Sequence, residues 1–491
     1  MLKKIKYPKL SDKFLRFVSI FLALIVLAIP ALVAAQTISV PRLSTKFSGI
    51  HDTSTAPPST TIAASPTQIL QIVNSNYKIS NLSGSGTTGT VSQLVNQSGV
   101  FLSDPQTFWD PSTSRFYFSM FENRGTSSPD EGIVLGFSKT ATPSSPADFC
   151  TYFFGFNYGS TSFPDRQSLG DTSDFLLISS DRFSTSTGAF LGSDTAWVTK
   201  PGPGSTCPSQ SSLIDGVQSL KNPGGTTFPY SPTSARQTDS SGTGWIISTP
   251  TFGNASTLSL YSVTKNITTG GAIIGSPTSI SVPAYAIPPT APQAGQTAAG
   301  QPAPSLETRE YLTQTYGGFD PRLGHNVLWT AHTVAGGAGS EVRWYEINPS
   351  VSGVDQYGQI NSPSLYVFNG AIAPDRLISG STSLYGSDAV ITVNTSSSST
   401  YPAIDVVSKE GSFPQSALKR IKQSPGPNVD YTCFQPSYHY CRWGDYPGAA
   451  PFPGAPTTGN MGQVWQTNQY NVSSTDDSNV DWRTFVALIN P

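Results

Sequence analysis

Short runs in which apolar and polar residues alternate recur in pairs along this chain. Seven pairs can be recognised, and each consists of two runs joined by a polar loop. The first runs are 68–74, 115–121, 174–180, 244–250, 326–334, 388–396 and 462–470, and the second runs are 77–83, 132–140, 194–200, 257–265, 341–349, 403–409 and 483–491. Alternation rich in β-branched and aromatic residues is typical of strands, and no segment between the runs has helical periodicity.

Some of these runs are apolar on both faces. In 115–121, Phe116, Phe118 and Met120 would share one face of a strand, whereas Tyr117 and Phe121 would lie on the other. A series of small sheets, each covered on both faces by its neighbours, is typical of a β-propeller. The pattern therefore predicts an all-β chain folded as a seven-bladed β-propeller. A six-bladed alternative follows if 68–83 only adds strands to the last blade.

Composition fits one large domain and excludes one class of partner. A propeller grows by adding blades, so 491 residues suit a single domain. The 26 Phe, 20 Tyr and 8 Trp supply apolar area for a core. The net charge of −2 gives no clustered basic face, which excludes nucleic-acid binding.

The N-terminus predicts export. Lysines and one arginine precede an uncharged run over 17–35, and Val33 and Ala35 fit the small-residue positions of a signal-peptidase site. Residues 1–35 are therefore interpreted as a signal peptide, and Pro30 favours cleavage. The alternative is an uncleaved membrane anchor, which would be the only membrane contact. Either way we expect a secreted or cell-surface protein.

The four cysteines suit an exported chain with two disulfides. Cys433 and Cys441 are close in sequence, which leaves Cys150 and Cys207 as the second pair. A metal site at the close pair is the competing interpretation, but the spacing matches no zinc pattern.

Two further segments are defined by composition. Residues 36–65 are rich in Ser, Thr, Pro and Ala without apolar periodicity, which predicts a solvated spacer. Residues 66–491 form the predicted propeller, which we expect to be monomeric.

Acidic residues precede the first apolar run of several units, and these are Asp104, Asp165, Asp375 and Asp445. In a propeller the segment that enters each blade runs along the central channel, so equivalent positions converge. Such carboxylates could bind a sugar or a cation such as Ca²⁺, or act as an acid–base pair. The alternative is that each carboxylate caps its own turn.

Asp445 has the most suggestive neighbours. Arg442, Trp443 and Tyr446 flank it, and an arginine, two aromatic rings and a carboxylate can hold a polar ring. Trp443 is equally consistent with a core position. No local catalytic motif accompanies the cluster.

Several motifs together resemble a group of exported bacterial β-propeller proteins. The segments that carry this resemblance are DPQTFWDPSTSRFYF, VRWYEINP, RWGDYPGAAPFP, VWQTNQYN and DWRTFVALINP. The resemblance covers about 66–491 and implies fold and export, but no particular activity. The chain departs from the group's acidic positions at Leu306-Glu307-Thr308-Arg309 and at Phe452. TDSSGTGW (238–245) is a near match to the repeat box of sialidase-type propellers, a more distant resemblance.

Two functions follow as hypotheses. The first is a binding or adhesion propeller that recognises a glycan or an extracellular protein through its central face. The second is a secreted carbohydrate-active hydrolase that uses channel carboxylates such as Asp104 and Asp445. A carboxyl separation of about 5–10 Å across an open cavity would permit the second.

Overall fold

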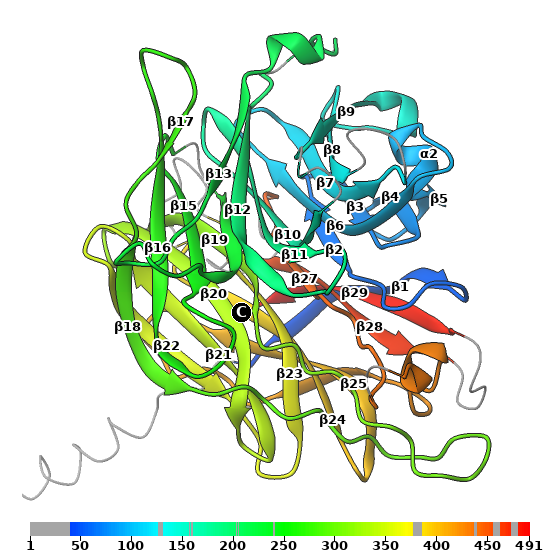
Figure 1. Cartoon of the computed structure of the whole chain (residues 1–491). Helices are drawn as coiled ribbons and strands as arrows, with labels where there is room; N and C mark the ends of the chain where they lie inside the picture. Colours follow the sequence, from blue (N-terminus) through cyan, green and yellow to red (C-terminus); the bar gives the residue numbers. More distant parts are fainter. Residues whose placement is uncertain are drawn as a thin grey trace, which may run out of the picture.

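The computed structural model describes residues 40–125, 131–156, 158, 161–202, 204, 206–238, 241–376, 385–436, 439–454, 462–472 and 480–491. These residues form the predicted all-β fold (Figure 1). The predicted export segment, residues 1–35, lies outside them. Within the described residues, no helix has the length and apolar character needed to cross a membrane.

The strands pair in antiparallel groups of four. The first three groups are β2 (Thr61–Ala64), β3 (Gln68–Ile72), β4 (Asn76–Asn81), β5 (Gly86–Thr90); β6 (Phe101–Asp110), β7 (Arg115–Asn123), β8 (Glu131–Ser138), β9 (Phe149–Gly155); and β10 (Ser162–Asp171), β11 (Phe175–Ser184), β12 (Phe190–Thr199), β13 (Asp215–Ser219). The next three are β14 (Tyr230–Gln237), β15 (Gly244–Thr249), β16 (Ala255–Lys265), β17 (Ala272–Ile274); β19 (Leu312–Asp320), β20 (His325–Gly336), β21 (Gly339–Asn348), β22 (Gly353–Ile360); and β23 (Tyr366–Pro374), β24 (Ala389–Ser397), β25 (Thr400–Lys409), β26 (Lys419–Gln423). The last group combines β27 (Gly448–Pro451), β28 (Val464–Asn471) and β29 (Trp482–Asn490) with β1 (Arg42–Asp52).

Few other elements are present in the described chain. β18 (Thr278–Tyr285) pairs with β16 beside β17, and a parallel pairing of β14 with β19 joins two groups into one sheet. Helical structure comprises α2 (Val91–Val95) and three short 3-10 helices, Pro146–Asp148, Gln210–Ser212 and Tyr431–Phe434.

The first strand of each group contacts the first strand of the next, and we call these the inner strands: β2, β6, β10, β14, β19, β23 and β27. The series returns on itself, because β27 also contacts β2.

Apolar clusters lie between successive groups. Phe116, Phe118 and Met120 of β7 pack towards the β2–β5 group, whereas Tyr117 packs with Leu176 of the β10–β13 group. The same arrangement continues through the last cluster, in which residues of β28 and β29 pack on β2 and β3. The predicted burial of β7 on both faces is thus confirmed.

A polar network crosses the inner strands. Arg236 of β14 is 3 % exposed, and its guanidinium donates to the Leu169 carbonyl of β10 and the Gln314 side chain of β19, each at 3.1 Å. A third bond reaches the Gln106 side chain of β6. Gln314 in turn donates to the carbonyls of Ile372 (β23) and Ala449 (β27), each at 2.8 Å. Two side chains therefore connect six of the inner strands.

The spacer prediction for 36–65 is wrong from residue 42 onward. β1 pairs antiparallel with β29, so that strands from the two ends of the described chain lie side by side (Figure 1). Residues 61–64 form the inner strand β2. For β1 the composition gave the wrong prediction because an outer edge strand is held by main-chain hydrogen bonds and does not need alternate apolar residues.

Both predicted disulfides are present. Cys150–Cys207 and Cys433–Cys441 have Cα–Cα distances of 5.5 Å and 3.9 Å. The first connects β9 to the loop that follows β12, and the second closes the loop that leads to β27.

Arg236→Met should destabilise the protein by about 3 kcal/mol, because it leaves buried acceptors on three inner strands without their charged donor. The control Lys265→Met removes an exposed lysine paired with the partly exposed Asp174 and should cost less than about 1 kcal/mol. Urea unfolding of both variants measures the difference. Equal shifts of the two midpoints would contradict the role given to Arg236.

Candidate functional site

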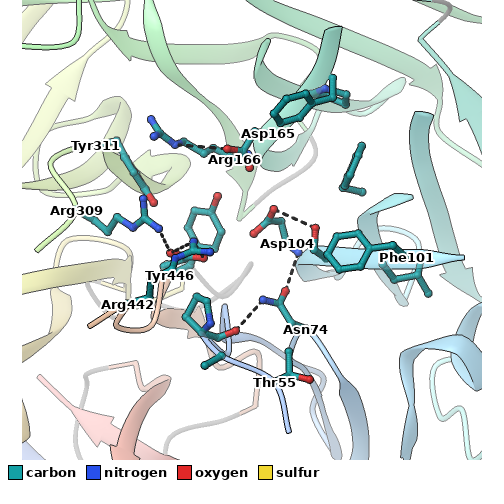
Figure 2. A pocket seen from close by; sticks show the side chains of 18 of the residues that line it. Thr55, Asn74, Phe101, Asp104, Asp165, Arg166, Arg309, Tyr311, Arg442 and Tyr446 are labelled. Carbon is teal, nitrogen blue, oxygen red and sulfur yellow. Dashed lines mark hydrogen bonds and ion pairs between the residues drawn. The ribbon is translucent and has the colours of Figure 1, made fainter. Parts of the chain in front are cut away.

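A cavity of about 390 Å³ opens where several inner strands begin. Its wall contains residues that precede or start β2, β6, β10, β19 and β27, with Asn74 from the β3–β4 hairpin. Figure 2 shows Arg309, Arg442 and Tyr446 on one side of it, and Asp104 and Phe101 on the other.

Irregular pairing near the start of inner strands shapes this wall. Register shifts occur in β6 after Ser103 and in β10 after Asp165. Asp104 and Arg166 lie at these shifts with left-handed backbone, at φ of 52° and 56°. Left-handed backbone is unfavourable for residues with a side chain, and β-bulges beside active sites commonly re-aim side chains. Here they place Asp104 and Arg166 in the cavity wall.

Asp445 forms the centre of an ion network. Arg442 Nη2 lies 2.9 Å and 2.8 Å from its two carboxylate oxygens, and Arg309 Nη2 also donates to it. Glu307 forms ion pairs with both arginines, at 3.0 Å from Arg309 Nη1 and 3.7 Å from Arg442 Nε. Burial alone would raise the pKa of Asp445, but Arg309 and Arg442 outweigh burial and hold that pKa at about 2.

Asp104 has the opposite electrostatic environment. Burial, with the neighbouring carboxylates Asp165 and Asp445, raises the pKa of Asp104 to about 7, although Arg442 acts in the other direction. Among the described residues, the hydrogen bonds that its carboxyl oxygens accept are long, at 3.3 Å from Ser103 and 3.5 Å from Ser59. The group is therefore easily protonated near neutral pH.

Ser59 connects these two carboxyl groups. Its Oγ lies 3.5 Å from Asp104 Oδ1 and 3.2 Å from Asp445 Oδ2, so the two oxygens are at most about 6.7 Å apart. Asn74 donates to the same Oγ at 3.0 Å and accepts from the Asp104 N–H at 2.8 Å. A carboxyl group with a pKa of about 7 and an ionised carboxylate thus face one cavity at a short separation.

Arg166 lines the cavity, and no described carboxylate lies within hydrogen-bonding distance of its guanidinium. Within the described structure, Nη1 is buried and makes no hydrogen bond. The nearest carboxylate oxygens are 3.7 Å from Nη1, in Asp181, and 4.0 Å from Nε, in Asp165. The guanidinium instead lies over the rings of Tyr230 and Tyr311, at 4.9 Å and 4.7 Å from their centroids.

Two buried phenols complete the wall. The rings of Tyr311 and Tyr446 lie 6.1 Å apart, and burial raises both pKa values well above the usual range. Both side chains therefore remain neutral hydrogen-bonding groups at physiological pH.

The structure brings together five of the predicted site residues: Asp104, Asp165, Arg442, Asp445 and Tyr446. Asp445 bonds mainly to arginines and not to the backbone of its own turn. Trp443 does not line the cavity; it is fully buried with Phe368, Cys433 and Cys441. Trp443 is therefore in the core, which was the alternative to a binding role.

Asp375 is not at the cavity and fits the capping alternative. It lies after the far end of β23, and its carboxylate accepts from the N–H groups of Gly386, Asp388 and Gly462 at 2.7 to 3.0 Å. Its resemblance to Asp165 in sequence is local only, since both follow proline and precede arginine.

Sequence reasoning missed four residues. Arg166 lies at the register shift of β10, and Ser59, Arg309 and Tyr311 precede inner strands, so apolar periodicity marks none of them. The suggested Ca²⁺ finds no preformed ligand set in the described part of the chain, where no group of three His, Cys, Asp or Glu residues is placed to hold a metal ion.

Comparisons with known proteins leave the family open. No protein-family model matches the chain, and no curated protein matches it. Solved structures with distant similarity include Trypanosoma rangeli sialidase in complex with sialic acid, at 7 % identity and TM-score 0.35 over 87 % of this chain and 59 % of that one. The parainfluenza virus 5 hemagglutinin-neuraminidase ectodomain is 10 % identical, with TM-score 0.37 over 84 % and 95 % of the two chains. A GH43_1 enzyme from Xanthomonas citri complexed with xylose is 8 % identical, with TM-score 0.30 over 66 % and 86 %. At these values we infer no activity from them.

Asp104→Asn should stabilise the protein at pH 8 and not at pH 4. The folded pKa of about 7 exceeds the unfolded value of ~3.9, so stability is lost as pH rises between the two, and an amide avoids this loss. We expect a gain of about 1–2 kcal/mol at pH 8, reduced by the partial exposure of the residue. Thermal melts at both pH values measure it.

The control Asp215→Asn changes an exposed strand position and should leave both melts unchanged. Destabilisation by Asp104→Asn at pH 8 would show that the carboxylate is a structural cap and contradict this prediction.

Proposed function

We propose that the protein is a seven-bladed β-propeller. Support comes from the groups of four strands, from the inner strands that contact one another in sequence order and return from β27 to β2, and from the apolar clusters between successive groups. Residues 68–83 supply β3 and β4 of a group with its own inner strand, which favours seven blades over six.

We further propose that the protein acts outside the cytoplasm and recognises a glycan with an acidic sugar unit in the central cavity. Two disulfides suit an exported chain. The observation that carries the glycan proposal is the Arg166 guanidinium, which lines the cavity with no acceptor closer than 3.7 Å among the described carboxylates. Arginine recognises a carboxylate through paired hydrogen bonds, so an acidic sugar supplies the missing acceptor.

The charge of the cavity fits this ligand. Arg166, Arg309 and Arg442 line it, opposed by the carboxylates of Asp165 and Asp445. With Asp104 protonated, the lining carries an excess of one positive charge, which is lost when Asp104 ionises near pH 7. Neutral phenols and exposed Phe101 add the apolar surface on which a sugar ring can lie.

Arg166→Lys should weaken binding of acidic glycans at least tenfold, because lysine keeps the charge but cannot form the paired hydrogen bonds. Purified residues 36–491 would be applied to an array of sialic- and uronic-acid-containing glycans. Wild-type binding should be stronger at pH 6 than at pH 8, since protonated Asp104 removes a negative charge beside the ligand.

The control Arg420→Lys, at a partly exposed position outside the cavity lining, should bind as wild type. Binding that is unaffected by Arg166→Lys, or confined to neutral glycans, would contradict the proposal of an acidic ligand.

A second candidate function is hydrolysis of the bound glycan. It is favoured by the pair of Asp104, with a pKa of about 7, and ionised Asp445, whose oxygens are at most about 6.7 Å apart. Glycosidases use two carboxyl groups whose environments separate their pKa values, one to protonate the leaving oxygen and one to remain charged. In this candidate Asp104 protonates the leaving oxygen as the glycosidic C–O bond breaks, and Asp445 stabilises the positive charge that develops on the sugar. Water then adds to the anomeric carbon and returns its proton to Asp104.

If this second function operates, 4-methylumbelliferyl glycosides of sialic and uronic acids should be hydrolysed below pH 7, with the rate falling as pH rises through about 7 because the acid is then ionised. Asp104→Asn should lower the rate at least a hundredfold while glycan binding persists. Release of fluorophore by the Asp104→Asn variant at the wild-type rate would exclude Asp104 as the acid.

A further inference from the structure

We propose that Asn74 and Gln167 are positioning residues for Asp104. They bind both of its main-chain polar groups from the two neighbouring groups of strands, and so hold its carboxyl group in the cavity. The inference concerns the same cavity as the proposed function, but its test contains no glycan, so that either proposal can fail without the other.

Left-handed backbone occurs at or just before the inner strand of every group. The residues that adopt it there have φ between 45° and 56°, and they are Ser59, Asp104, Arg166, Ser231, Arg309, Asn369 and Gly444. A residue with a side chain keeps this unfavourable conformation only where its surroundings hold it. Contacts that fix such a residue are therefore part of the design of each group.

Two of these residues show how the fold provides such contacts. The N–H of Ser231 donates to the Asp181 carboxylate of β11, and that of Asn369 donates to the Thr333 hydroxyl of β20, each at 2.9 Å. Both acceptors lie in the second strand of the preceding group. A side chain of the neighbouring group thus binds an N–H that lies within a register shift of the inner strand.

Asp104 is held in this way at both of its main-chain groups. Its N–H donates to Oδ1 of Asn74, just beyond the second strand of the preceding group, at 2.8 Å. Its carbonyl accepts from Nε2 of Gln167, in the inner strand of the following group, at 2.7 Å. Gln167 is 3 % exposed, so water competes little for this bond. The pairing of β6 with β7 skips Asp104 and Pro105, hence these side chains replace the strand partner.

The Asn74 amide is itself held in one orientation. Its Nδ2 donates to the Pro57 carbonyl at 2.8 Å and to Ser59 Oγ at 3.0 Å. Because the amide nitrogen faces these acceptors, the amide oxygen is directed to the Asp104 N–H. This side of Asp104 presents the uncharged side chains of Asn74 and Ser59.

The position fixed by these contacts decides how Asp104 titrates. Burial is the largest cause of its raised pKa, followed by the carboxylates of Asp165 in β10 and Asp445 before β27, whereas Arg442 lowers that pKa. The neutral Tyr446 phenol also interacts with Asp104. When either amide contact is lost, the main chain can leave the left-handed conformation and carry the carboxyl group into the open cavity. The pKa of Asp104 should then fall towards its ordinary value.

The effect of Asp104→Asn on thermal melting of the purified protein tests the inference. With all other residues unchanged, Asp104→Asn should raise the melting temperature at pH 8 and not at pH 4. Gln167→Met keeps an unbranched side chain of similar length but removes the donor, so in this background the rise at pH 8 should fall to less than half. Asn74→Leu removes the other contact and should have the same effect, and each background gives a result without the other.

Thr333→Val is the matched control, because it removes the equivalent contact at Asn369, which is not among the residues that line the cavity. It should lower the melting temperature itself and leave the rise caused by Asp104→Asn unchanged. A rise at pH 8 that persists in full in the Gln167→Met or the Asn74→Leu background would overturn the inference, as would no rise in the otherwise unchanged protein. An equal reduction in the Thr333→Val background would show a general loss of stability and would overturn it too.

Discussion

The sheets of this protein have apolar residues on both faces, and most other features of the structure depend on that. Exposing either face of such a sheet to water is unfavourable, so the sheet needs a neighbouring sheet on each side, and each neighbour has the same requirement. Apolar clusters meet this requirement, and the cluster between β28–β29 and β2–β3 does so where the last group of strands packs on the first. The inner strands are then forced together, and their polar groups need partners away from water. Arg236 and Gln314 supply these partners across six inner strands.

The same arrangement gathers distant parts of the chain at one cavity. Asp104, Arg166 and Tyr446 are far apart in sequence, yet each lies at or just before the start of an inner strand. The ion network then gives the carboxyl groups of Asp445 and Asp104 different environments. Asp445 is paired with two arginines and stays ionised. Asp104 has no arginine or lysine within hydrogen-bonding distance in the described part of the chain and is readily protonated. Arg166 is left with aromatic neighbours and carboxylates that are too distant for hydrogen bonds, which suits recognition of an acceptor from outside.

The alternating runs of the sequence predicted the two central strands of each group, such as β7 and β8 for 115–121 and 132–140. The alternating pattern did not predict the inner and outer strands because they are more polar: the sequence of β10 is SFPDRQSLGD, and that of β22 is GVDQYGQI. This explains the mixed result for the acidic residues. Asp165 and Asp375 stand in the same tripeptide, but one begins an inner strand and the other follows the end of one. Arg309 and Ser59 were not predictable, since their left-handed backbone belongs to irregular segments that only tertiary contacts define.

We propose Arg166 as the anchor for an acidic group in the cavity. The most direct measurement is a crystal structure of residues 36–491 soaked with an acidic trisaccharide that binds in solution. If Arg166 is the anchor, the carboxylate of the sugar will lie within hydrogen-bonding distance of the Arg166 guanidinium, between Asp104 and Tyr311. A trisaccharide bound elsewhere on the surface, or bound in the cavity with its carboxylate turned away from Arg166, would contradict it.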